Sequence, residues 1–201
     1  MRVPGQDERT LATAGLGAFF RPRQARDQGL SFANLQRLVA AGTVERVARG
    51  LYRKTGVEPD ALESVAMACA RSPHAIVCLF SALAVHGLTT QMPRDVWLGL
   101  DRKARRPVPN DVSLRVVRFS GAMLTYGIVS TSLLGVPARV TSPARTVVDC
   151  FRYRNRIGLD VALEALRDAV RTRTVTVDEI TRAAEVCRAR TLVKPYLEAL
   201  E

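Results

Sequence analysis

The stretch GLSFANLQRLVAAG, residues 29–42, decides the fold of the N-terminal part of the chain. Gly29 tolerates the left-handed conformation needed at the turn between two helices. Ser31 predicts an N-cap, and a helix then follows over residues 32–41. One face of that helix is apolar, and we expect it to pack inward through Phe32, Leu35, Leu38 and Val39.

The opposite face of this helix carries no acidic residue. It combines small and polar side chains: Ala33, Asn34, Arg37, Ala40 and Ala41, with Gln36 at its edge. Small residues allow a helix to enter the major groove of DNA, arginine donates twice to guanine, and Asn or Gln pairs with adenine. The pattern therefore predicts a recognition helix, with Ser31, Asn34, Gln36 and Arg37 among the residues that contact DNA.

The flanking segments complete a DNA-binding pattern. A short helix over residues 22–28, which carries Arg23, precedes the turn, and a basic hairpin over residues 43–54 follows. A hairpin in that position is a wing, whose cations reach phosphates or a minor groove; here they are Arg46, Arg49, Arg53 and Lys54. The order of these elements predicts a winged helix-turn-helix that binds DNA, rather than one with a purely structural role.

The charge distribution points to the same partner. The net charge is +11, and the first 54 residues hold ten Lys/Arg and four Asp/Glu, which leaves +6 in that segment. An excess of this sign favours a polyanion, with nucleic acid ahead of an acidic membrane surface. No apolar run approaches the roughly 20 residues of a spanning helix, and the start lacks the pattern of a signal peptide. We expect a soluble, cytoplasmic protein with no membrane partner.

The fold class predicted for the whole chain is α+β. A turn-rich stretch at residues 55–60 divides it into a DNA-binding domain, 1–56, and a mixed α/β domain with a small sheet and a helical C-terminus, 57–201. In the second domain we expect strands over 96–100, 114–119, 127–131 and 136–140, and a basic loop over 103–111. Expected helices begin at Asp60, Ala75, Ser142, Thr176 and Thr191, and a further one carries Leu163, Leu166 and Val170.

Three motifs resemble a known family. They are the N-terminal run from Gly29 to Arg53, SALAVHGL at residues 81–88, and VTSPARTVVD at residues 140–149. Together they resemble AbiEi-type antitoxins of bacterial type IV toxin–antitoxin, or abortive-infection, systems. The resemblance implies a protein that represses its own operon by binding inverted repeats in double-stranded operator DNA. It also implies that the second domain neutralises a nucleotidyltransferase-like toxin, usually without a stable complex.

The motif residues expected to matter in the second domain are Ser81, His86, Ser142, Arg145 and Asp149. Two alternatives to an antitoxin stay open. One is a winged-helix transcriptional regulator whose second domain senses a ligand or dimerises. The other is an enzyme that acts on nucleic acid.

The pattern of reactive residues argues against an enzyme. Ser81 and His86 are five apart on a predicted helix, so their side chains point about 140° apart. His86 is interpreted as a helix C-terminal residue whose partly positive ring the helix dipole favours, and Asp149 as a partner of Arg145 or Arg152. The four cysteines form no Cys-x-x-Cys pair, which predicts reduced, buried thiols. We therefore expect no catalytic residue, metal or cofactor.

Overall fold

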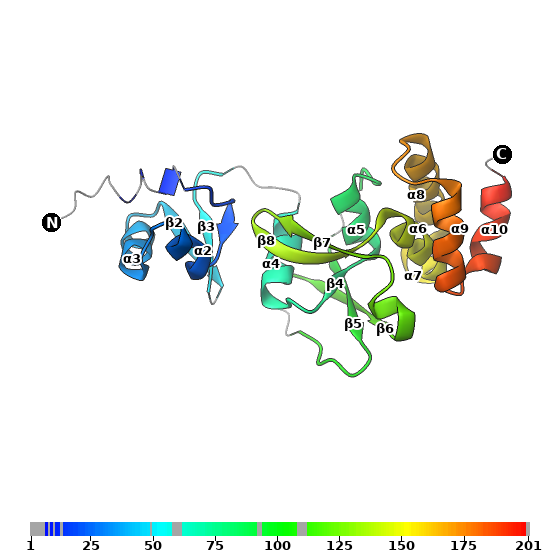
Figure 1. Ribbon diagram of the computed structural model, residues 1–201, viewed down its shortest axis with the longest axis horizontal. Helices are drawn as coiled ribbons and strands as arrows, with labels where there is room; N and C mark the ends of the chain where they lie inside the picture. The colour runs from blue at the N-terminus through cyan, green and yellow to red at the C-terminus, as the bar shows by residue number, and fades with distance from the viewer. Residues whose placement is uncertain are drawn as a thin grey trace. The chain divides into compact units, whose positions relative to one another are not determined.

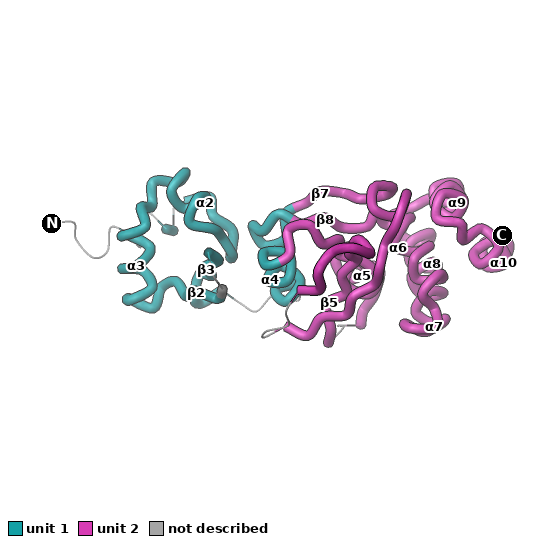
Figure 2. The backbone as a smooth tube through the Cα atoms, turned by 90° about the horizontal axis from the view of Figure 1, so that it is seen from below, with its two compact units in different colours: residues 1–71, 132–137 teal, residues 72–131, 138–201 magenta. Residues whose placement is uncertain are grey.

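The protein, described from a computed structural model, has mixed α and β structure. The structure describes residues 7, 9, 11–12, 14–48, 50–57, 62–91, 94–107 and 112–199. The chain forms two compact units (Figures 1 and 2): Met1–Arg71 with Ser132–Pro137, and Ser72–Thr131 with Ala138–Glu201. This division differs from the predicted boundary between residues 56 and 57, which stays a prediction.

The first unit contains a small antiparallel sheet and its helices. The elements are β1 (Phe19–Phe20), α2 (Pro22–Asp27), α3 (Phe32–Ala40), β2 (Val44–Ala48), β3 (Leu51–Lys54) and α4 (Glu63–Arg71). The strand order is β1-β3-β2. Pro22 begins α2, Gly29 takes a φ of 82° in the turn, and Ser31 caps α3 as predicted. Their packing forms one core of Leu11, Phe20, Ala25, Leu30, Leu35, Leu38, Val44 and Tyr52.

The second unit is built around a five-stranded sheet of order β6-β5-β4-β8-β7, except that the end of β7 and the start of β8 fall within Ser132–Pro137 of the first unit. The strands are β4 (Ile76–Val77), β5 (Val96–Asp101), β6 (Leu114–Phe119), β7 (Ile128–Leu133) and β8 (Val136–Thr141). β4 runs antiparallel to β5 and parallel to β8, and β5 runs parallel to β6. A short 3-10 helix, η1 (Gly121–Leu124), follows β6.

Helices form the rest of the second unit, and most of them follow the last strand (Figure 1). They are α5 (Leu79–His86), α6 (Pro143–Arg152), α7 (Arg154–Ile157), α8 (Leu159–Arg171), α9 (Val177–Val186) and α10 (Arg190–Glu198). Helix α6 packs against α5, α8 and α9 at the centre of the core. Ser142 caps α6, and Thr176 with Glu179 forms the predicted capping box of α9.

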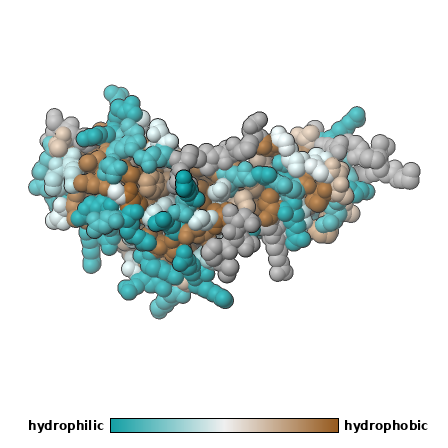
Figure 3. Space-filling view, turned by 180° about the vertical axis from the view of Figure 1, so that it is seen from behind, coloured by the Kyte–Doolittle hydropathy of each residue, from teal (hydrophilic) through white to brown (hydrophobic). Residues whose placement is uncertain are grey.

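The core of this unit joins the sheet to these helices. Phe151 of α6 stacks on Tyr196 of α10, with 5.0 Å between the ring centroids. All four cysteines are buried and free, as predicted. Hydrophilic side chains project outward on the face drawn in Figure 3, and hydrophobic residues show between them.

Several expected elements differ in detail. The helix expected from Ala75 begins only at Leu79, because Ile76 and Val77 instead form a strand between β5 and β8. The last helix begins at Arg190, with Ala189 rather than a threonine as its N-cap. Asp60, the expected cap of another helix, lies outside the described residues, as do residues 108–111 of the basic loop.

The expected inward face of α3 is wrong at Phe32, which is 63% exposed. At about 100° per residue, the buried arc runs from Leu35 through Leu38 to Asn34. The buried face of the helix is therefore centred nearer to Asn34 than predicted. Phe32 lies outside this face, on the side of Leu35.

Candidate nucleic-acid interface

Helix α3 presents one exposed face without an acidic side chain. Ala33, Gln36, Arg37 and Ala40 are all exposed. Their spacing of three, four and seven places them along a single stripe of the helix. Since no residue of α3 is acidic, the stripe offers one cation, one amide and two small side chains to a partner.

Asn34 does not belong to this face, so its predicted place there is wrong. It is 5% exposed, and its side-chain amide donates to the Asp7 carboxylate. Its amide oxygen accepts from the backbone N–H and the hydroxyl of Ser31. Asn34 therefore completes the capping box of α3 and ties the helix to Asp7, and at 5% exposure it offers almost no surface to a base.

Asp7 also forms an ion pair with Arg37, the exposed arginine of the stripe. Arg37 Nε lies 2.8 Å from Asp7 Oδ2, with side chains 56% and 7% exposed. The pair restricts the rotamer of Arg37 while the guanidinium remains open to solvent. Because Asp7 precedes the helix by a long stretch of chain, no local pattern in the sequence pointed to it.

The arginines of the β2–β3 hairpin differ in their ion pairs. Arg46 is exposed and has no ion-pair partner among the residues that the structure describes. Arg53 forms ion pairs with Glu45, its cross-strand neighbour, and with Glu63 of α4. Burial alone would lower the pKa of Arg53, but the hydrogen bonds and charges of these two carboxylates raise it overall. The predicted phosphate contact of Arg53 therefore competes with two carboxylates.

The other residues predicted to contact DNA differ in how exposed they are. Lys54 donates to the backbone oxygen of Leu16 at 2.8 Å and is partly buried. Arg23 is exposed on α2, and Ser31 is exposed at the start of α3. Arg49 lies outside the described residues. The structure thus brings Gln36, Arg37, Arg46 and Arg23 to the surface of one unit.

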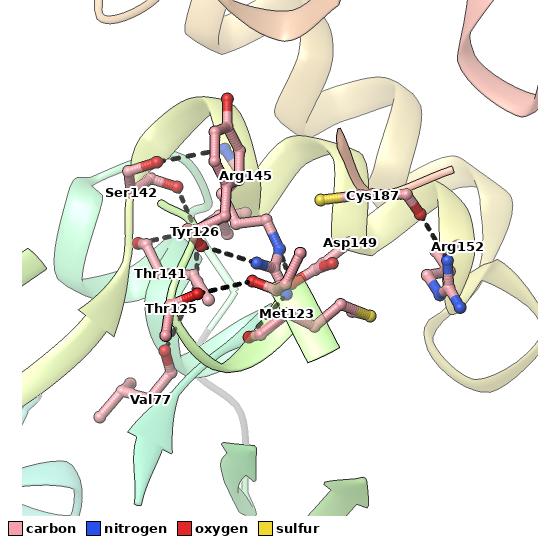
Figure 4. Close-up of polar contacts among 12 residues, drawn as sticks. Val77, Met123, Thr125, Tyr126, Thr141, Ser142, Arg145, Asp149, Arg152 and Cys187 are labelled. Carbon is pink, nitrogen blue, oxygen red and sulfur yellow. Dashed lines mark hydrogen bonds and ion pairs between the residues drawn. The ribbon is translucent and has the colours of Figure 1, made fainter. Parts of the chain in front are cut away.

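In the second unit, the motif around α6 is a buried ion pair with supporting hydrogen bonds (Figure 4). Arg145 Nε lies 2.8 Å from Asp149 Oδ2, and both side chains are fully buried. The same guanidinium donates to the backbone oxygens of Tyr126, at 2.8 Å, and Met123, at 3.4 Å. Arg145 therefore joins α6 to the segment between β6 and β7, which confirms the structural interpretation of Asp149 as its partner.

The carboxylate of this ion pair has fewer partners than the guanidinium. Asp149 Oδ1 has no hydrogen-bond partner among the described residues. Burial raises the pKa of Asp149 to about 6, although the charge and hydrogen bond of Arg145 lower it. Arg145 also lies over the Phe119 ring, 5.2 Å from its centroid.

Ser81 and His86 form hydrogen bonds to different strands, β5 and β8. Ser81 Oγ accepts from the backbone N–H of Trp97 at 2.9 Å. His86 Nε2 lies 2.6 Å from the backbone oxygen of Thr141 and donates to it. Burial lowers the pKa of His86, and the bond to Thr141 offsets this only in part. His86 is the last residue of α5, as predicted. Its burial works against the expected partly positive ring, because burial favours the neutral form of the imidazole.

Within the described part of the chain, no three His, Cys, Asp or Glu side chains gather where they might hold a metal ion. Burial raises the pKa of the Cys69 thiol to about 12 and those of Cys78, Cys150 and Cys187 as well. These thiols stay protonated and buried, which disfavours a nucleophilic role. Over the same described residues, no helix is both long and apolar enough to cross a membrane.

The sequence patterns did not predict one cluster of arginines around a tryptophan. Trp97 and Arg115 are register partners on the parallel strands β5 and β6, and the Arg115 guanidinium lies 5.5 Å from the Trp97 ring centroid. Arg156 of α7 lies 5.8 Å from the same ring. The aligned positions of the tryptophan and the arginine on two expected strands were the only signal.

Comparison with known proteins bears on the first unit. Residues 9–53 match a family model described as "Transcriptional regulator, AbiEi antitoxin". The matched range includes β1, α2, α3, β2 and most of β3. No curated protein matches the chain at a significant level. The resemblance predicted from the N-terminal motif is thereby confirmed for that region, while the resemblance of the two later motifs stays a prediction.

Proposed function

We propose that this chain is a DNA-binding antitoxin of a bacterial type IV toxin–antitoxin system, with a winged helix-turn-helix in its first unit. One observation carries the proposal: the match to AbiEi antitoxin regulators covers two helices and a hairpin, and the second of these helices, α3, carries no acidic residue. Helix, turn, helix and hairpin follow one another in the order that such modules use.

In this proposal α3 enters the major groove. Gln36 and Arg37 reach base edges, because they are the exposed hydrogen-bonding residues of the stripe. Ala33 and Ala40 allow close approach to the groove. Asp7 holds Arg37 in place through its ion pair, so the guanidinium loses less rotamer entropy on binding.

Phosphate contacts come from cations that the protein itself leaves unpaired. Arg46 on the hairpin and Arg23 on α2 meet that condition among the described residues. Such contacts fix the position of the module and carry no sequence information. Arg53 contributes less, since it already forms ion pairs with Glu45 and Glu63.

In this proposal the second unit neutralises the toxin. Autorepression is an activity of the first unit. The motif residues of this unit act as supports: Ser81, His86, Ser142, Arg145 and Asp149 all bond to backbone or to one another. Neutralisation would then depend on the surface that these residues hold in shape, and not on chemistry at the motif itself.

Two experiments test the two halves of the proposal. DNase footprinting of the full chain on the DNA upstream of its own gene should protect inverted repeats. Co-expression with the neighbouring gene should restore growth that the neighbour alone stops. Protection at no inverted repeat, or no rescue of growth, would contradict the corresponding half.

A second candidate is a winged-helix transcriptional regulator whose second unit senses a ligand. A pocket beside Trp97 in that unit favours it, because three arginines converge there. Two observations would separate the candidates. An adjacent gene for a nucleotidyltransferase-like protein would favour the antitoxin, whereas release of the operator on addition of a small anionic compound would favour the regulator.

A further inference from the structure

A pocket in the second unit is built on the aromatic ring of Trp97. It has a volume of about 230 Å³ and lies among β5, β6, α5 and α7. The Arg115 and Arg156 guanidiniums lie 5.5 and 5.8 Å from the centroid of that ring, and Arg94 lines the same pocket. A cation held against an indole ring loses side-chain freedom, so the ring fixes the places of two donors.

The charges of the pocket are unbalanced. Its only acidic lining residue is Asp95, within the part of the chain that is described. Both carboxylate oxygens of Asp95 are already engaged, Oδ1 by the Ser113 hydroxyl at 2.5 Å and Oδ2 by Arg115 Nε at 2.6 Å. These hydrogen bonds lower the pKa of Asp95, so it stays ionised and orients Arg115.

Two of the three guanidiniums have no polar partner within the protein. Among the described residues, neither the Arg94 nor the Arg156 guanidinium donates to an acceptor or pairs with a carboxylate, although Arg156 lies over the Trp97 ring. Three guanidiniums and one carboxylate leave the pocket with a net charge of +2. Phosphomonoesters carry between about −1.5 and −2 at pH 7, whereas each phosphodiester of a nucleic acid carries one negative charge.

We propose that this pocket binds the phosphate group of a small phosphomonoester, with Arg94, Arg115 and Arg156 as its donors. Guanidinium forks match phosphate oxygens in pairs, and these charge-assisted bonds are the strong ones. The concave shape and the charge of the pocket favour a compact dianion over an extended strand. The inference concerns the second unit alone and stands whether or not the first unit binds DNA.

Trp97 is the only tryptophan of the chain, so its fluorescence reports on the pocket directly. The full chain is titrated with inorganic phosphate and with adenosine 5′-monophosphate, at constant ionic strength and pH 7.5. We expect a saturable change for both probes, with a midpoint below about 10 mM. Sodium chloride at equal ionic strength should produce no saturable change.

Two variants and one matched control locate the site. Arg94→Gln and Arg156→Gln should each raise the midpoint by roughly tenfold, since each removes a charged donor. Arg167→Gln, at an exposed position of α8 outside the pocket, should leave it unchanged. Thermal melting first checks that each variant is folded. Because Arg94 is exposed, at least that variant is expected to fold normally.

Three results would overturn the proposal. The first is the absence of a saturable change with either phosphate probe. The second is a midpoint that both pocket variants leave unchanged. The third is saturable binding of an oligothymidylate with hydroxyl ends that adenosine 5′-monophosphate fails to displace, which would assign the pocket to a nucleic-acid strand instead.

Discussion

Two arginines of the same hairpin show how partners decide the role of a residue. Arg46 is exposed and unpaired within the described chain, whereas Arg53 forms ion pairs with both Glu45 and Glu63. The sequence treats them alike, as cations of a wing. Only the fold brings Glu63 of α4 to Arg53, so local pattern had no means to separate them.

The first prediction compares these two positions. Arg46→Ala should weaken binding to operator and random DNA about equally and reduce the slope of log affinity against log salt by about 1. Arg53→Ala should change that slope less and should lower the melting temperature, because it leaves two carboxylates facing each other. Fluorescence anisotropy at several salt concentrations, with melting curves alongside, measures both. An equal loss of salt slope in the two variants would contradict this assignment.

The second prediction concerns the pH dependence that Asp149 gives to stability. Burial raises its pKa in the folded protein to about 6, from an ordinary value of 3.8. The folded state therefore binds more protons than the unfolded state between these values. The contribution of Asp149 to the free energy of unfolding is full below about pH 4 and is lost as the pH rises toward 6.

Asp149→Asn removes this titration and serves as the comparison. Denaturant unfolding from pH 4 to 7 should show the stability of the wild type, relative to the variant, falling across that window. A difference that stays constant would show that the carboxyl titrates normally. If the variant does not fold, Asp149→Glu supplies the comparison, since it keeps the titrating group and moves it.

At the scale of single elements, the β5–β6 pair depends on one glycine. Gly99 lies against the buried ring of Phe119, which is two residues beyond its register partner Val117, and a Cβ at residue 99 would come within 2.2 Å of that ring. The clash is with a ring that is fully buried in the core. A side chain at this position requires Phe119 to move.

The third prediction is that Gly99→Ala lowers the free energy of unfolding by about 1–3 kcal/mol, the usual cost of overpacking a core. Gly15→Ala is the matched control, because a Cβ there meets no atom within 4 Å. Urea unfolding of both variants provides the measurement. Equal stability of the two would mean that Phe119 adapts without cost.

The sequence predicted the elements that local signals define. Ser142 followed by Pro143, and the Thr176 capping box, each begin a helix where expected. Strand β4 was missed because its two residues show no periodicity and gain their structure from neighbours on both sides. The orientation of α3 was missed for a related reason: the buried partner of Asn34, Asp7, lies far away in sequence.

At the scale of the whole molecule, the chain has two compact units with separate cores. The observed division after Arg71 does not fall at the turn-rich stretch at residues 55–60, on which the predicted boundary rests. The assignment of residues 132–137 to the first unit was not predictable, because only tertiary contacts reveal it: the Phe19 backbone N–H donates to Leu134 at 3.0 Å.

The fourth prediction is that loss of DNA binding leaves toxin neutralisation intact. A triple variant, Gln36→Ala with Arg37→Ala and Arg46→Ala, removes exposed groups of the first unit only. Expressed from a constitutive promoter with the cognate toxin, it should still restore growth. Circular dichroism and thermal melting establish that it is folded. Failure of a folded triple variant to rescue growth would show that DNA binding itself protects the cell.

The central claim is that the exposed stripe of α3 reads DNA, and base preference at the operator tests it most directly. Affinity for every single-base variant of one inverted repeat is measured with the wild type, with Arg37→Ala and with Arg190→Ala, an exposed arginine of the second unit, as the control. Arg37→Ala should cost about 1–3 kcal/mol at the cognate repeat and remove discrimination at one base position, while the control changes neither. Unchanged discrimination at every position in Arg37→Ala, and likewise in Gln36→Ala, would contradict the account.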